Sequence, residues 1–229
     1  MSLFASIFPI ACWLAYNLLV PYVERSHPSL SVIMSMQRRR WVANITRRES
    51  PMDAILSGNL MQAVSLLAST SMLIVLAISA AFGQVRAIME TLTDLGLGHD
   101  YTAAAMQIHL LVLLVIFVAS FFAFTLSLRQ FNHFCIMIGA ISHDVPSTAE
   151  EIEAIAMLNS LAAKNFNNGI RAYYFAVPAI VWFASDWLSI VVTVVTVLFI
   201  VHREFFSSAH RVAASVAVIA SRREHERQS

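Results

Sequence analysis

Long apolar runs separated by short polar segments dominate the chain. The runs cover residues 3–23, 55–82, 104–131 and 172–202. A membrane-spanning helix needs roughly 20 consecutive apolar residues, so each of the first three runs predicts one crossing. The fourth run contains Asp186 in the stretch AIVWFASDWLSIVV. It is therefore either one crossing with a costly buried charge or two short arms that turn at Asp186.

The distribution of the 15 lysines and arginines favours the turn. Cytoplasmic segments of membrane proteins collect these residues. A single fourth crossing puts nine of them inside and six outside, whereas two arms put 14 inside and one outside. We therefore expect about five crossings, with the N-terminus outside, the C-terminus in the cytoplasm and a short hairpin at the end. Trp182 and Trp187 flank its turn, where indole rings favour the membrane interface.

Three segments between the apolar runs predict further helices. Residues 29–50 carry an apolar stripe beside the arginines and can lie on an anionic leaflet; the stripe consists of Ile33, Met36, Trp41 and Ile45. Residues 144–166 predict a turn and a helix that continues into the fourth run, bending near Gly169. Ser147 with Glu150 and Thr148 with Glu151 have capping-box spacing there. Residues 85–100 predict a short outer helix ended by Gly96 and Gly98.

Composition agrees with an integral membrane protein. Apolar residues make up 58% of the chain and charged residues 13%, about half the charged share of a soluble domain. The mean hydropathy is +0.69. We expect an all-α, polytopic membrane helical bundle with cytoplasmic amphipathic helices, forming one domain over residues 1–229. The net charge of +1 gives no sign of a nucleic-acid partner, and we expect Cys12 and Cys135 to lie at different depths without a disulfide.

A basic cluster at the inner end of the third run is the first candidate site. Arg129, Asn132 and His133 are spaced i, i+3 and i+4 and so share one helical face. One interpretation is an interfacial anchor, in which Arg129 pairs with an acid such as Asp53. The other is a cytoplasmic vestibule that binds an anion or a lipid headgroup, or a proton relay through His133. The arginines that can add charge to a vestibule are Arg38, Arg39, Arg40 and Arg171.

Polar side chains within the apolar runs are the second candidate. In the second run these side chains fall broadly on one side of the helix. They can either support helix packing through small and hydroxyl residues or line a polar path. Asn17 of the first run has the same two interpretations. The residues of the second run are Asn59, Gln62, Ser69 and Thr70.

No motif predicts an enzyme. The chain lacks a Gly-rich phosphate loop, a His-Glu-x-x-His zinc motif and a serine nucleophile elbow, and we expect no cofactor and no metal. Two weaker alternatives exist. His133 and His202 could ligate haem or a metal, and an outer acidic group could bind a cation; that group is His99, Asp100, Glu90 and Asp94.

Three stretches resemble the bacterial membrane family called domain of unknown function 599. They are LLASTSM in the second run, SLRQFNH at the end of the third and GIRAYYFAVP at the start of the fourth, and RRRWV before the second run also fits. The resemblance covers about residues 10 to 205. It implies a bacterial inner-membrane protein with similar proteins in plants, and it implies no activity. The motif positions are Arg129, Asn132, His133, Arg171, Tyr173 and Tyr174; the basic tail departs from the pattern.

Two functional hypotheses follow. The first is a non-enzymatic membrane protein that acts by association with other protein chains, either as a homo-oligomer or as an accessory subunit of a larger complex. Its other partners are the membrane lipids around it. The second is a small channel or transporter whose basic cytoplasmic vestibule favours anions or lipid headgroups.

The five-crossing topology is testable with single cysteines introduced after removal of the two native ones. A cysteine at Ser229 should resist a membrane-impermeant thiol reagent in intact cells, because the C-terminus is cytoplasmic. A cysteine at Ser185 should react. Labelling of the Ser229 position in intact cells would restore the four-crossing topology.

Overall fold

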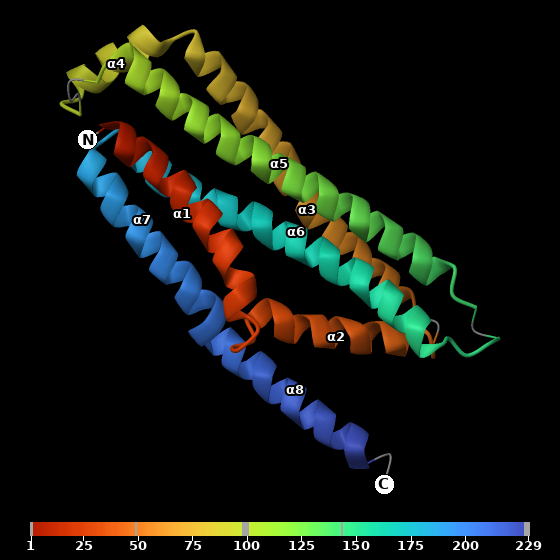
Figure 1. Cartoon of the computed structure of the whole chain (residues 1–229). Helices are drawn as coiled ribbons and strands as arrows, with labels where there is room; N and C mark the ends of the chain where they lie inside the picture. Colours follow the sequence, from red (N-terminus) through yellow and green to blue (C-terminus); the bar gives the residue numbers. More distant parts are fainter. Residues whose placement is uncertain (1, 49, 98–100, 143, 227–229) are drawn as a thin grey trace. The chain divides into compact units, whose positions relative to one another are not determined.

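Helices are the only regular secondary structure in the described part of the chain. The computed structural model describes residues 2–48, 50–97, 101–142 and 144–226, and within them it contains helices and no strand (Figure 1). The elements are α1 (Ser2–Val23), α2 (Leu30–Ile45), α3 (Pro51–Phe82), α4 (Val85–Asp94), α5 (Ala103–Gly139), α6 (Ala149–Val181), α7 (Asp186–Val201), the π-helix η1 (His202–Phe206) and α8 (Ser208–Glu226). The predicted all-α class is confirmed.

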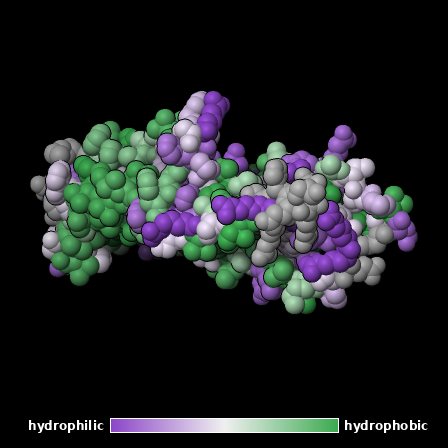
Figure 2. Space-filling model, turned by 90° about the horizontal axis from the view of Figure 1, so that it is seen from below, coloured by the Kyte–Doolittle hydropathy of each residue, from purple (hydrophilic) through white to green (hydrophobic). Residues whose placement is uncertain are grey.

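Within the described residues, four helical stretches are long and apolar enough to cross a membrane. They are Leu3–Val23, Pro51–Phe82, Ala103–Gly139 and Asp186–Ile219. Leu18, Leu66, Leu73 and Leu198 are 63–69% exposed, and Figure 2 shows large continuous areas of hydrophobic side chains. Such surfaces suit a lipid environment, so the chain is a helical membrane bundle. Helix α6 is not among the four stretches, and the fifth crossing stays a prediction.

The predicted turn at Asp186 is confirmed. Helix α6 ends at Val181 and α7 begins at Asp186. The two arms pack against each other, because Ser189 donates a hydrogen bond to the Pro178 carbonyl (2.9 Å) and the Tyr174 and Phe199 rings are 5.8 Å apart. The expected continuation of the 144–166 helix into the fourth run is also confirmed, since α6 is unbroken from Ala149.

The chain divides into two compact units. Unit 1 consists of Met1–Val20, Ser65–Thr125 and Asn167–Ile200, and unit 2 of Pro21–Val64, Leu126–Phe166 and Val201–Ser229. The boundaries fall inside α1, α3, α5 and α6 and before the last residue of α7, so these helices contribute residues to both units. The single domain expected from the sequence stays a prediction.

A close approach of α5 and α6 organises unit 1. Ser120 donates a hydrogen bond to the Gly169 carbonyl (3.1 Å), and a Cβ at Gly169 would lie 2.5 Å from the ring of Phe124. Phe124 is fully buried. Glycine is therefore required for this approach. The core of the unit contains Met106, Ile116 and Trp182.

Unit 2 holds α2, which corresponds to the predicted amphipathic segment 29–50, and the C-terminal helix α8. Ser29 caps α2 by accepting a hydrogen bond from the Val32 amide (3.4 Å), and α8 packs against α2. The predicted apolar stripe of α2 is wrong at Met36, which is 48% exposed, whereas Val42 is fully buried. A 3.6-residue period places position 42, rather than 36, near the face of Ile45.

The caps of the remaining helices follow the sequence signals in part. Thr148 Oγ1 accepts a hydrogen bond from the Glu151 amide (3.2 Å), so Thr148, rather than Ser147, caps α6. The predicted outer helix is α4, and Gly96 follows it with φ +69°, the left-handed conformation that favours glycine. Gly98 lies outside the described residues.

The close approach at Gly169 predicts a stability difference between two glycines. Gly169→Ala should lower the free energy of unfolding by about 1–3 kcal/mol, because the new methyl group forces the buried Phe124 ring to move. Gly139→Ala is the matched control, since no atom lies within 4 Å of a Cβ there. Thermal unfolding in a mild detergent measures both, and an equal melting temperature for the two variants would contradict the packing account.

Candidate functional site

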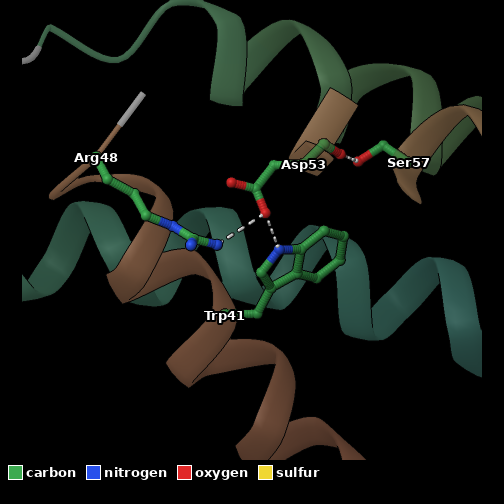
Figure 3. Close-up of polar contacts among 4 residues, drawn as sticks. All are labelled: Trp41, Arg48, Asp53 and Ser57. Carbon is green, nitrogen blue, oxygen red and sulfur yellow. Dashed lines mark hydrogen bonds and ion pairs between the residues drawn. The ribbon is translucent and has the colours of Figure 1, made fainter. Parts of the chain in front are cut away.

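A buried carboxylate joins α2 to α3 in unit 2. Trp41 Nε1 donates a hydrogen bond of 2.7 Å to Asp53 Oδ1, and Arg48 Nη2 lies 3.5 Å from the same oxygen (Figure 3). Ser57 donates to the Asp53 backbone carbonyl (2.8 Å). The indole therefore makes the shorter of the two side-chain contacts to a carboxylate that is largely removed from solvent.

The sequence around Pro51 explains why an acid is tolerated here. Pro51 opens α3 and Asp53 lies in its first turn, where a proline fits and the helix dipole stabilises a negative charge. Asp53 is 4% exposed. Its Oδ2 atom has no hydrogen-bond partner among the described residues. Because Asp53 is held by Trp41 and Arg48, its expected ion pair with Arg129 is not formed.

The three residues of the basic cluster point into solvent or lipid rather than into unit 2. Arg129, Asn132 and His133 are all exposed. Their helix is fixed from its other side, where Ser127 donates to the Ala162 carbonyl (2.7 Å) and Gln130 accepts from Asn165 (2.8 Å). The common face predicted from their spacing is thus an outer face of α5.

The arginines of α2 differ from one another. Arg39 Nε forms a 2.6 Å ion pair with Glu153 of α6, and both side chains are about 60% exposed. Such an exposed pair contributes little to stability. Arg38 and Arg40 are half-buried. Burial lowers the pKa of the Arg38 guanidinium below its ordinary value.

Arg171 has a different setting in unit 1. It is 8% exposed, its Nη1 donates to Asn17 Oδ1 (3.3 Å), and its guanidinium lies 5.2 Å from the centre of the Tyr16 ring. Asn17 in turn donates to the Trp13 carbonyl (3.0 Å). The structure therefore brings together two candidates that the sequence assigned to different groups, Arg171 and Asn17.

The polar residues of α3 that the sequence singled out lie mostly on its outer side. Asn59, Gln62 and Ser69 are exposed, whereas Thr70 is half-buried and donates to the Leu66 carbonyl of its own helix (2.8 Å). Ser71 is instead fully buried and lies 3.0 Å from the Tyr173 hydroxyl.

Sequence analysis missed a buried histidine in unit 1. His109 is fully buried, its Nε2 contacts the Ala179 carbonyl at 2.7 Å, and its ring stacks on Trp182 at 3.9 Å. Tyr101 stacks on the same indole at 4.4 Å. Burial and the neighbouring Asp186 raise the pKa of Tyr101 to about 12. The only signal in the sequence was a lone histidine in an apolar run.

The metal alternatives gain no support. Within the described residues, no group of three or more His, Cys, Asp or Glu side chains could hold a metal ion. His133 and His202 are both exposed. His99 and Asp100 lie outside the described residues, so the outer cation site cannot be placed.

Comparison with known proteins identifies one family. The family model described as "Protein of unknown function, DUF599" matches residues 4–209. No curated protein matches the chain, and no solved structure matches it.

The hydrogen bond between Trp41 and Asp53 predicts that the protein becomes less stable when this bond is removed. Trp41→Phe should lower the free energy of unfolding by about 1–3 kcal/mol, because a buried carboxylate loses its shorter hydrogen bond. Trp187→Phe is the matched control, since Trp187 is 67% exposed. Equal losses in the two variants, measured by thermal unfolding in detergent, would show that the hydrogen bond contributes nothing.

Proposed function

Since the chain belongs to the DUF599 family of proteins of unknown function, we propose its role from its own surface: it is a non-enzymatic membrane protein that acts by association. It assembles with copies of itself or with a larger membrane complex. The resemblance to the family supports a bacterial inner membrane. The distribution of lysines and arginines supports an N-terminus outside and a C-terminus in the cytoplasm.

The outward polar face of α3 carries this proposal. Gly58 and Gln62 of unit 2 are four residues apart and are both exposed, so they form one short stripe along the helix. Asn59 lies beside it. The described part of the chain offers Asn59 and Gln62 no hydrogen-bond partner, although α3 is long and apolar enough to span a membrane.

Membrane physics explains why such a stripe favours association. An amide in hydrocarbon without a partner costs several kcal/mol. Small residues let a second helix approach closely, and Gly58 has no atom within 4 Å of a Cβ position. Amide side chains can then bond across the interface. A carboxamide both donates and accepts, so two Gln62 side chains related by a two-fold axis can bond each other.

A channel or transporter is the second candidate. Its support is the exposed face of Arg129, Asn132 and His133 in unit 2, which can attract anions or lipid headgroups by charge. Arg171, which the sequence analysis placed in the same vestibule, is instead buried in unit 1 beside Asn17. Association is favoured because it uses the polar face of α3 without requiring a continuous path.

The proposed association predicts the mass of the extracted protein and a weaker assembly when Gln62 is replaced. The protein extracted in mild detergent should have a mass that is a multiple of 25.4 kDa, or should carry a partner with it. Gln62→Leu should weaken assembly about 3- to 30-fold, since one interhelical hydrogen bond in a membrane contributes roughly 0.6–2 kcal/mol. Light scattering with the detergent mass subtracted measures this.

The control is Gln84→Leu, which removes an equally exposed carboxamide from the α3–α4 connection and should leave the mass unchanged. A monomer with no associated protein would overturn the proposal. So would a Gln62→Leu variant that assembles as tightly as the original chain.

A further inference from the structure

Two buried amide nitrogens in unit 2 have no hydrogen-bond partner among the described residues. They are Nδ2 of Asn159 on α6 and Nε2 of Gln37 on α2. Asn159 as a whole is 1% exposed. Native proteins rarely leave buried donors unpaired, and the exceptions commonly bind a water or an ion.

A cation lies next to Gln37. Arg38 is half-buried, and burial lowers the pKa of its guanidinium. The structure gives it no ion pair within the described ranges. The neighbouring acids are engaged elsewhere, since Glu153 binds Arg39 and Asp53 binds Trp41 and Arg48. A partly desolvated guanidinium without a carboxylate has its charge available for an external anion.

Helical spacing places Arg38 and Asn159 on facing sides of α2 and α6. Val42 and Ile155 belong to one apolar cluster, Arg38 precedes Val42 by four residues, and Asn159 follows Ile155 by four. Residues four apart share a helix face. In unit 2 the two helices run in opposite directions (Figure 1), so one turn back along α2 corresponds to one turn forward along α6.

We propose that Arg38 and Asn159 form a binding site for a phosphate-type oxyanion. Both contribute N–H donors at the site, and an oxyanion supplies acceptors for both together with the charge that Arg38 needs. A water molecule could satisfy the Asn159 amide but would leave the guanidinium without a counter-ion. The chemistry is shared by free phosphate and by the phosphodiester of an anionic lipid. The site does not depend on the proposed association through α3.

The experiment measures thermal stabilisation of the full chain by two probes. Inorganic phosphate is compared with chloride at equal ionic strength, and nanodiscs containing phosphatidylglycerol are compared with nanodiscs of phosphatidylcholine alone. At a tenfold excess over its dissociation constant, a bound ligand should raise the Tm by about 3–5 °C. Stabilisation by phosphate identifies a free oxyanion, and stabilisation by phosphatidylglycerol alone identifies a lipid headgroup.

Three variants assign the effect to the site. Arg38→Gln and Asn159→Leu should each lose most of the Tm rise, whereas Arg47→Gln should keep it, because Arg47 is exposed elsewhere on the same segment. If Asn159→Leu fails to fold, the comparison of the Tm rise in Arg38→Gln with that in Arg47→Gln still tests the site. The proposal is overturned if neither probe stabilises the original chain, or if Arg38→Gln responds as Arg47→Gln does. An Asn159→Leu variant that is more stable and still responds would also overturn it.

Discussion

The capping of backbone carbonyls at the end of α6 is the constraint on which unit 1 depends. A helix that ends inside an apolar bundle leaves its last four carbonyls without intrahelical donors, and hydrocarbon offers no water to replace them. Here the Pro178 carbonyl accepts from the Trp182 amide and from Ser189, and the Ala179 carbonyl is met by His109. The carbonyls of residues 180 and 181 accept from amides of the turn itself. The chain can therefore reverse at Asp186 with a donor for each of the last four carbonyls of α6.

This constraint also explains what the sequence could and could not predict. The turn was predictable because a charge interrupts an apolar run and because the distribution of basic residues favours a reversal there. The role of His109 was not, since its partner lies 70 positions along the chain and no local spacing joins them. The same limit applied to Asp53. The sequence identified it as an acid that can pair with a basic residue, but its contact with Trp41 rather than Arg129 depends on how α2 packs on α3.

Periodicity predicted which residues share a face but not which way the face points. Arg129, Asn132 and His133 do lie together, on an outer face of α5. Asn59, Gln62 and Ser69 are exposed, whereas Thr70 bonds to its own helix. The orientation of a helix depends on which of its faces packs against the neighbouring helices. In α3 the buried positions around the amides include Ser57, Val64 and Ala68, and this leaves the amides outside.

Polar groups in this protein therefore fall into two kinds. Those that link helices inside a unit find partners in the chain, as Asp53, Ser127 and Arg171 do. Those of the second kind, Gln62 on the surface and Asn159 in the interior, find none in the described residues. An unpaired amide costs free energy in the protein interior and in the hydrocarbon of a membrane, because it gives up hydrogen bonds with water there. A sequence that places amides at such positions gains stability only when another molecule supplies the missing acceptor, and for this reason both proposals concern binding partners rather than a reaction.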